Sequence, residues 1–394
     1  MATIAENLLE LQQAKSNIKS AIEGKGQDLT NVPFTQYGEK IAEIQTGNVD
    51  LSETTATADD VLQGKEFFNA SGEKVTGTFI NPLQWKCDNM KSLRYEFYET
   101  DAGLDVTPVP DFMNSLDTSM VTNFYRTFYR YKGESVGNFS TISATNMQEM
   151  FNEAIYLKEL PTGFVTDNVT TLERAFNNTR IKTTPVLNLN KVTTMSSAFY
   201  GSDVETVNLI NTTNVQNWGS TFWGCSYLTE LNIDTRSGTY FYTFIAGCRG
   251  LITVNGLDFR SVTSSSGLNN LMSNTCKNIT NFFVKNIPQS IRIGSGSGTG
   301  STDYGTLLTL DSLLNTIQEL WTNTGTSTLT LTMGTANTSK LADVYVKLIP
   351  ITDEMRAEDE YIDNKAPFVQ CESTDEGAML ITEYVTTVKK WQLA

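Results

Sequence analysis

The pattern of apolar and polar positions repeats between about residues 115 and 293, with a period of 22 to 28 residues. The first five copies open with valine or alanine, the sixth opens with Ser237, and the seventh is stretched; each copy has large apolar residues at its fourth and eighth positions. The fourth positions are Phe124, Met147, Leu172, Met195, Trp218, Tyr240 and Leu268. The eighth positions, called anchors, are Phe128, Phe151, Phe176, Phe199, Phe222, Phe244 and Met272. Such a period predicts a solenoid, in which each copy is one coil packed on its neighbours.

The spacing within each copy predicts a short helix followed by a short strand. The fourth and eighth positions lie one helical turn apart, so a helix such as Val192–Phe199 would bury both. Apolar positions alternate in the segments that follow, as in one-sided strands. The candidate strands are 157–160, 186–189, 204–209, 228–233, 251–254 and 279–284. The expected fold class is an α/β repeat: a leucine-rich-repeat-like solenoid with a parallel sheet on one face.

A heptad-like apolar stripe precedes the repeats, on a helix predicted from Ile4 to about Gly24. The stripe consists of Ile4, Leu8, Leu11, Ile18 and Ile22, and Lys15 interrupts it. One interpretation is an amphipathic helix that packs on its own domain. The other is an oligomerisation and attachment helix, with a trimer favoured, although three heptads alone form only a marginal helix.

Weaker patterns predict the remaining elements. Pro33 begins a second short helix through Ile44, and a hairpin joins Phe67 to Val75 through turn residues 69–72. Beyond a Gly/Ser/Thr-rich segment, we expect a helix over 310–321, a strand over 329–333 and a helix over 338–349. The predicted organisation is a helical attachment segment (1–50), a linker with hairpin (51–80), a region that caps the start of the solenoid (81–114), the solenoid (115–293), and closing repeats with a C-terminal cap (294–394).

Composition excludes several functions for this chain of 394 residues. Its net charge of −15 and pI near 4.6 argue against nucleic acid as a partner. Histidine is absent, which excludes histidine-dependent nucleophilic catalysis and histidine-ligated metals. No cofactor is expected. The five cysteines are widely spaced without a CxxC pair, and Cys225, Cys248 and Cys276 fall just after anchors, which favours reduced core thiols.

The N-terminus has neither a basic region nor an apolar stretch typical of a secretory signal, and no apolar run has membrane-spanning length. We therefore expect synthesis in a bacterial cytoplasm and no membrane partner. Residues 349–378 carry a net charge of −7, which predicts a solvated loop. The alternative is a divalent-cation site that uses carboxylates such as Asp353, Glu354, Glu358 and Asp363.

Two sets of residues are candidates for binding a partner. Tyr129, Tyr200 and Trp223 directly follow anchors, so they either form an exposed aromatic column that stacks on sugar rings or pack between neighbouring copies. The second set is expected to line a concave strand face, as in other solenoids: Glu205, Asn208, Glu230 and Asn232. A carboxylate pair for glycoside hydrolysis would have to come from residues such as Asp203, Glu205, Glu230 and Asp234. Because nothing distinguishes these from polar surface, we do not expect an enzyme.

Two resemblances add to this interpretation. Leu11–Gly26, Tyr37–Ile44 and Asp60–Thr78 resemble the N-terminal attachment segment of tail proteins from phages of Gram-positive bacteria, notably in the string GK…F…GEKVTGT. Segments 194–199, 211–215 and 221–233 resemble BspA-like leucine-rich repeats, a class of surface protein. The last twelve residues resemble the ending that caps many such arrays, with Lys390 where that class often has glycine.

Together, the resemblances imply a virion structural protein of a phage tail: a tail fibre, baseplate or receptor-binding protein. Its partners would be other tail or baseplate proteins and a glycan or protein of the host cell surface. A bacterial BspA-like surface adhesin is the first alternative, and it predicts a signal peptide and a wall anchor. A tail-associated polysaccharide-degrading enzyme is the second, and it predicts reducing-end release from host wall material.

Overall fold

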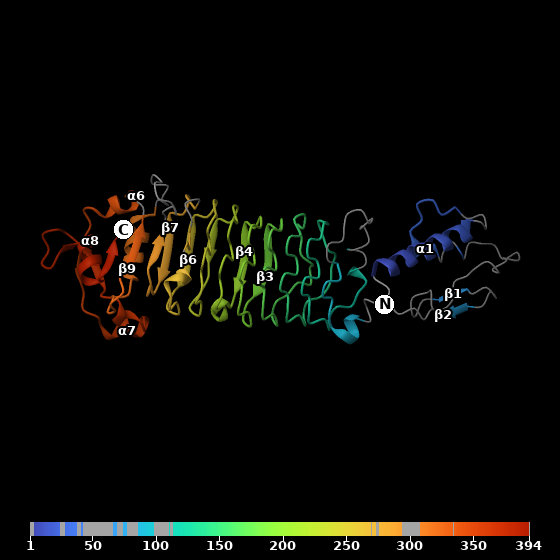
Figure 1. Ribbon diagram of the computed structural model, residues 1–394, viewed down its shortest axis with the longest axis horizontal. Helices are drawn as coiled ribbons and strands as arrows, with labels where there is room; N and C mark the ends of the chain where they lie inside the picture. The colour runs from blue at the N-terminus through green and yellow to red at the C-terminus, as the bar shows by residue number, and fades with distance from the viewer. Residues whose placement is uncertain are drawn as a thin grey trace. The chain divides into compact units, whose positions relative to one another are not determined.

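The computed structural model describes residues 4–23, 28–37, 41, 66–68, 74–76, 86–97, 110, 113–268, 270–272, 276–293, 308–333 and 335–393. The chain divides into two compact units, Met1–Trp85 and Lys86–Ala394. Among the described residues the fold is mixed α/β, with several parallel sheets and no closed barrel (Figure 1).

The first unit contains one long helix and one hairpin. Helix α1 (Ile4–Glu23) confirms the predicted helix, and strands β1 (Glu66–Phe68) and β2 (Lys74–Thr76) confirm the hairpin, with Phe67 opposite Val75. The second short helix begins as predicted with one 3-10 turn, η1 (Phe34–Gln36), whereas Ile44 lies outside the described residues.

The stripe on α1 is placed in part. Ile22 is buried with Leu29 and Tyr37, and the half-buried Ile18 packs against this cluster, so this end of the stripe packs within its own unit. Leu11 is 44% exposed. The side chains of Ile4 and Leu8 lie outside the described residues. The exposed Leu11 leaves the oligomerisation hypothesis as a prediction.

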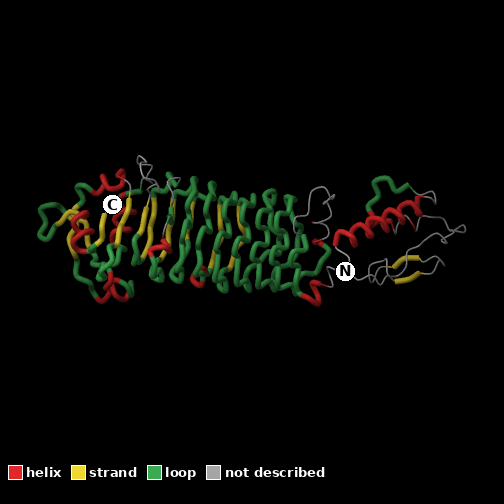
Figure 2. Tube along the Cα trace, in the orientation of Figure 1, coloured by secondary structure: helices red, strands yellow, loops and turns green. Residues whose placement is uncertain are grey.

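In the second unit, the predicted helix is wrong in the first six copies. From its third to its tenth position, each of these copies consists of two successive tight turns. In the seventh copy a short 3-10 helix, η5 (Ser265–Leu268), forms at the start of the predicted helix, and residue 269 lies outside the described residues. The backbone N–H groups of Phe124, Arg126 and Phe128 donate to carbonyl oxygens of the next copy at 2.8–3.1 Å. The same bonds recur from copy to copy, and Figure 2 shows the loops of this region stacked one on the next. We call this arrangement the turn ladder; it comprises residues 92–97, 123–130, 146–153, 171–178, 194–201, 217–224 and 240–247.

The turns bury the same positions that a helix would bury. Within a copy, the N–H of the seventh residue donates to the carbonyl oxygen of the fourth, as in Thr127 to Phe124. The sixth residue then takes a positive φ, 53° at Arg126, and the tenth does so again, 55° at Arg130. Because this geometry recurs every four residues, the fourth and eighth side chains both point into the core. All the fourth-position side chains but Tyr240, and all seven predicted anchors, are buried.

The third residue of each copy has its own role in the ladder. The N–H of the fifth residue makes no bond to the next copy, so it needs another acceptor. Asn123 Oδ1 accepts from Tyr125 N at 3.0 Å, and Asn217 Oδ1 accepts from Gly219 N at 3.0 Å. Thr194 Oγ1 does the same for Ser196. Asn, Thr and Ser recur at this position because they complete a local turn.

The sixth copy is shifted by one residue from the prediction. Tyr240, not Thr239, is bridged to Asn217, and Ile245 N donates to Leu271 O, so Ile245 is the anchor and Phe241 the fourth residue. Tyr240 is accordingly 40% exposed rather than buried. The first residue of this copy is therefore Gly238 instead of Ser237. A Cβ at Gly238 would lie 2.3 Å from the Phe241 ring, so a larger residue would require that ring to move.

The structure also contains a copy that the sequence pattern did not reveal. Ser92 is bridged to Asn123, and Phe97 N donates to Thr127 O at 2.8 Å. The Phe97 ring stacks on Phe128 with centroids 5.0 Å apart. The region predicted to cap the solenoid therefore carries one more copy of the repeat, which we call the leading copy.

Parallel strands follow the turn ladder in several copies. They are β3 (Thr183–Asn188), β4 (Thr206–Ile210), β5 (Glu230–Asn232), β6 (Thr253–Asp258) and β7 (Asn281–Lys285). β3 pairs with β4, and β5, β6 and β7 form a second parallel sheet. These strands overlap the predicted segments. The predicted strand 157–160 is not formed.

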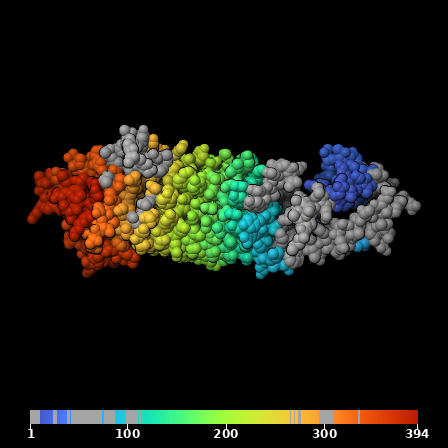
Figure 3. All heavy atoms as spheres, viewed as in Figure 1, coloured from blue at the N-terminus to red at the C-terminus, as the bar shows by residue number. Residues whose placement is uncertain are grey.

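The anchors form a continuous aromatic core. From Phe97 to Phe222, neighbouring anchor rings stack with centroids 5.0–6.0 Å apart. In Figure 3 the described parts of the second unit follow one another in chain order, so copies adjacent in sequence are adjacent in space. Each copy thus buries its anchor against the copies before and after it.

The closing part contains β8 (Ile291–Ile293), α5 (Leu310–Gln318), β9 (Leu329–Met333), α6 (Thr335–Thr338), β10 (Tyr345–Leu348), α7 (Asp353–Glu358), β11 (Phe368–Cys371), β12 (Met379–Leu380), α8 (Ile381–Glu383) and β13 (Trp391–Leu393). Helix α5 and strand β9 confirm two predictions. The predicted helix 338–349 is wrong for the most part. The end of α6 and a 3-10 turn, η6 (Ser339–Leu341), occupy its start, but β10 follows and lies between β11 and β12 in an antiparallel sheet. The last strand, β13, pairs in parallel with β9.

Candidate functional site

The outer face of the turn ladder is charged in its first half. The sixth and tenth positions, which have a left-handed backbone, hold arginine in the first copy and glutamate in the second. Arg126 Nε lies 2.8 Å from Glu149 Oε2, and Arg130 Nε lies 2.6 Å from Glu153 Oε2. The hydrogen bond that Arg126 donates to Glu149 raises the pKa of Arg126. These ion pairs connect equivalent positions of adjacent copies, so their first role is to hold the copies together.

Tyr129 belongs to this charged half. The guanidinium carbons of Arg126 and Arg130 each lie 5.1 Å from the centre of its ring, within cation–π distance. Arg126 also lies 5.3 Å from the Tyr125 ring, which packs edge-on against Tyr95. Tyr129 is thus part of a tyrosine–arginine cluster.

The aromatic column predicted from Tyr129, Tyr200 and Trp223 is only partly formed. Tyr200 and Trp223 stack with centroids 4.3 Å apart and planes at 15°. The equivalent position in the two intervening copies holds asparagine, Asn152 and Asn177, so Tyr129 is separated from this pair. Trp223 is nevertheless 38% exposed. The pair packs between copies and also offers aromatic surface to solvent, which combines the two predicted roles.

Two further exposed aromatic residues were missed from the sequence. Tyr240 and Tyr242 are 40% and 41% exposed, and their rings lie 6.3 Å apart at 25°. They occupy the third and fifth positions of the sixth copy, both on the outer face. The one-residue shift of this copy concealed them, since the predicted register placed Tyr240 in the core. Trp218, by contrast, is fully buried as its fourth position predicts.

Of the four candidate residues of the strand face, two make polar contacts with neighbouring residues and two are exposed. Lys182 Nζ lies 2.9 Å from Glu205 Oε1, and Asn208 Nδ2 donates to Thr184 O at 2.6 Å. Glu230 and Asn232 are exposed at the two ends of β5, on either side of the buried Leu231. A partner-binding role for these four residues stays a prediction.

The carboxylates considered for catalysis are held by neighbouring cations. Asp203 lies 3.4 Å from Arg180, and Asp234 forms an ion pair with Arg236, two residues further on. Arg236 N also donates to Asp234 Oδ1 at 3.1 Å, so Asp234 completes a local turn. These contacts give both carboxylates a structural role.

The cysteines that follow anchors are structural. Cys225 Sγ donates to Phe199 O at 2.9 Å, Cys248 Sγ to Phe222 O at 2.9 Å, and Cys276 Sγ to Ile245 O at 3.0 Å. All three are buried, and burial raises the pKa of the Cys225 thiol to about 12. Each thiol thus bonds to the anchor of the preceding copy.

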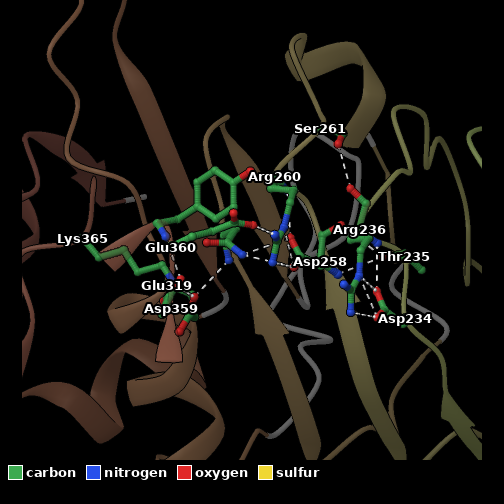
Figure 4. A network of polar contacts seen from close by, with 12 residues as sticks. Asp234, Thr235, Arg236, Asp258, Arg260, Ser261, Glu319, Asp359, Glu360 and Lys365 are labelled. Atoms are coloured by element: carbon green, nitrogen blue, oxygen red, sulfur yellow. Dashed lines mark hydrogen bonds and ion pairs between the residues drawn. The ribbon is translucent and has the colours of Figure 1, made fainter. Parts of the chain in front are cut away.

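The acidic segment is partly docked rather than wholly solvated. Asp258 and Arg260 at the end of β6 form an ion pair, and Arg260 also pairs with Glu360 (Figure 4). Asn286 Nδ2 donates to both oxygens of Asp258 at 3.1 Å. Further along, Lys365 pairs with Glu319 and, at 2.6 Å, with Asp359 (Figure 4). We call these contacts the closing network, because they connect the repeats to the C-terminal part.

The predicted cation site gains no support among the described residues. Arg356 pairs with Asp353 at 3.2 Å and with Asp363 at 3.1 Å, which uses two of the four proposed ligands. In the parts of the chain that the structure describes, no group of three or more acidic or thiol side chains is placed to hold a metal ion. None of the helices in those parts is both long and apolar enough to cross a bilayer.

Lys389 gives a prediction for pH dependence. Its Nζ donates to Gln318 O at 3.1 Å and Leu320 O at 2.5 Å, and burial lowers its pKa to about 7 from an ordinary 10.5. Between these values the unfolded chain binds a proton that the native state has released. The free energy of unfolding is therefore expected to rise with pH from about 7 to 10.5, by at most about 1.4 kcal/mol per unit. Urea unfolding at several pH values measures this.

Lys389→Met is the control, because a thioether does not titrate. As the pH rises from about 7 to 10.5, the free energy of unfolding of the natural chain should rise relative to that of the variant. Parallel profiles for the two proteins would contradict the role of Lys389.

Comparison with known proteins found a family model that matches the repeats. A family model described as "Mycoplasma protein of unknown function, DUF285" matches residues 91–209 and 118–248. BspA-like repeat proteins carry this domain family. No curated protein and no solved structure matches the chain.

The DUF285 match coincides with the turn ladder. Its first stretch begins at residue 91, at the start of the leading copy, and its second ends at residue 248, just after the sixth copy of the ladder. The two stretches overlap over 118–209, as expected for a model that fits a repeated unit in more than one register. The similarity to DUF285 therefore concerns the repeats, not the first unit.

Proposed function

We propose that the chain is a non-catalytic tail protein of a bacteriophage, located in the virion and made in the host cytoplasm. In this proposal residues 1–80 dock on other tail or baseplate proteins. The copies form a leucine-rich-repeat-like solenoid that presents a surface to the host cell or to a neighbouring virion protein. No membrane, nucleic acid or cofactor takes part.

The stacking of the copies supports the solenoid. In the turn ladder, the bonds between copies run from each copy to its immediate neighbours, as Met195 N to Asn217 O and Trp218 N to Tyr240 O. Parallel strands, and anchors stacked in the core, follow the same order of copies. Nearest-neighbour contacts of this kind are typical of a solenoid and support the proposal.

The single observation that carries a binding function is the exposure of aromatic side chains on the outer face of the ladder. Trp223, Tyr240 and Tyr242 are each 38–41% exposed and come from neighbouring copies. Large aromatic residues are concentrated at binding surfaces, where they bury much area with few rotatable bonds.

The first unit supports attachment to a virion. The hairpin β1–β2 forms within the GK…GEKVTGT string that resembles phage tail proteins. On α1, Leu11 remains exposed while Ile22 is buried, so part of the stripe is available for a second helix. We propose a homotrimer, and light scattering of the full chain measures the mass directly.

Immunogold labelling tests the virion assignment. An antibody raised against the full chain should label the tails of purified phage particles from the organism that encodes the gene. Labelling of bacterial envelopes without particles would instead support a BspA-like adhesin, the second candidate, which the DUF285 similarity favours. Particles that remain unlabelled would contradict the virion role.

A further inference from the structure

The outer face of the turn ladder loses its charge in the second half of the repeats. Segments 192–202, 215–228 and 238–248, which form the ladder of copies four to six, contain no Asp, Glu, Lys or Arg. Copies one to three carry charges there, among them Arg126 and Glu149. Charged residues make up 19% of the chain and concentrate on surfaces, so three ladder segments in succession without charge form a distinct face.

Aromatic rings are concentrated on this uncharged face. We define the aromatic face as Tyr200, Trp223, Tyr240 and Tyr242. Tyr200 and Trp223 form one stacked pair at 4.3 Å, and Tyr240 and Tyr242 form another at 6.3 Å. Trp223, Tyr240 and Tyr242 keep more than a third of their surface exposed in spite of these contacts.

Gly219 lies against the Tyr240 ring, and a small residue occupies the ladder position next to Trp223. A Cβ added to Gly219 would lie 2.7 Å from Cε1 of Tyr240, so this ring lies against the backbone of the preceding copy. Beside Trp223, the next copy has Ala246 at the equivalent position, and its side chain is only a methyl group. Because the rings are placed before any ligand binds, little conformational entropy is lost on binding.

Neutral polar groups surround the rings. Gln216 and Thr239 are exposed directly before the ladder segments of the fifth and sixth copies, and Ser196 and Ser197 are half-buried at the fifth and sixth positions of the fourth copy. Thr239 Oγ1 donates to the backbone carbonyl oxygen of Gln216 at 3.3 Å. Hydroxyl and amide groups donate and accept hydrogen bonds without a net charge.

This chemistry selects among ligand classes. Nucleic acids and acidic polymers require lysine or arginine, and protein interfaces usually add arginine to their aromatic residues. A sugar ring instead places its C–H face on an aromatic ring and its hydroxyl groups on neutral donors and acceptors. We infer that the aromatic face binds a neutral glycan. This inference deepens the proposed function and rests on it only in taking the repeats as the binding part.

Affinity electrophoresis of the full chain tests the inference. Native gels contain dextran, a galactomannan or a β-1,3-glucan as neutral probes, and alginate as an acidic probe. The chain should be retarded by at least one neutral polysaccharide and not by alginate. Raising the salt concentration from 0.05 to 0.5 M, values that change screening several-fold, should leave the retardation unchanged because no charge is involved.

Three variants locate the site. Trp223→Ala and Tyr242→Ala should each weaken the apparent affinity about tenfold, since each removes one stacking surface. Gly219→Ala should weaken it as well, because the added methyl group displaces the Tyr240 ring while every aromatic residue remains. Tyr156→Ala is the control: Tyr156 is 48% exposed but outside the aromatic face, and its loss should change nothing.

Two results would overturn the inference: no retardation by any neutral polysaccharide, or equal retardation of the natural chain and of Trp223→Ala, Tyr242→Ala and Gly219→Ala. Circular dichroism confirms that each variant is folded. The outcome is independent of immunogold labelling. Labelled tails without retardation would remove the glycan site alone, whereas retardation without labelled particles would remove the virion role alone.

Discussion

Phe199→Ala is expected to lower the free energy of unfolding of the second unit by about 3–5 kcal/mol. The Phe199 ring is fully buried between two other anchors, with centroids 5.0 Å from Phe176 and 5.6 Å from Phe222. Alanine would leave a cavity in the stack, because the backbone on both sides is fixed by the turn ladder and cannot close the gap. Urea unfolding followed by tryptophan fluorescence measures the loss.

The control for this prediction is an exposed apolar residue. Ile252→Ala, at a side chain that is 46% exposed, should change the free energy of unfolding by less than about 0.5 kcal/mol. A cost for Phe199→Ala as small as that of the control would show that the anchor stack does not hold the copies together.

Lys365→Met is expected to destabilise the protein by about 3–5 kcal/mol, through the closing network. The Lys365 side chain is 2% exposed and bonds to two carboxylates, Glu319 and Asp359, which are 14% and 29% exposed. Methionine has a similar volume but no charge, so both carboxylates would remain largely buried without a cation. Thermal and urea unfolding both report this loss.

Lys347→Met provides a matched control in the same part of the chain. Lys347 pairs with Asp375 at 3.4 Å, but both side chains are about 40% exposed. An exposed pair of this kind contributes about 0–1 kcal/mol, so the variant should be nearly as stable as the natural chain. If both lysine variants cost the same, burial of the Lys365 ion pairs would not be the cause.

The sequence predicted the repeat, because its apolar spacing follows directly from the buried anchors. It could not distinguish helix from turn, since a four-residue step buries the fourth and eighth side chains in both. The left-handed sixth position gave no warning, because it holds Arg126 and Thr243, which are not glycine or asparagine. The asparagines at third positions, Asn123, Asn146 and Asn217, did contain the signal. They favour local turns over helices.

Two other errors come from the local sequence. In the sixth copy Phe241, Phe244 and Ile245 are all large and apolar, so the anchor could be placed one residue too early. The leading copy was missed because Phe97 and Phe128 are 31 residues apart, outside the spacing of the other anchors.

For the site, the sequence placed Tyr200 and Trp223 correctly next to anchors and missed Tyr240 and Tyr242 through the shifted register. The closing network was not predictable. Arg260 and Glu360 are 100 residues apart and belong to no repeating pattern. Lys390, at the position where the resemblance to BspA-like repeats implies glycine, has a positive φ of 56°, a conformation that glycine adopts without steric cost.

The turn ladder gives this kind of protein a modular way to change in evolution. Because the ladder bonds of a copy go to its two neighbours only, a duplication or loss of one whole copy recreates the same interfaces on both sides. Each such event would lengthen or shorten the stack by about 4.8 Å without a new core having to be selected. A gain or loss of copies before the fourth would therefore change how many copies separate the aromatic face from the start of the ladder, while the chemistry of the face is kept.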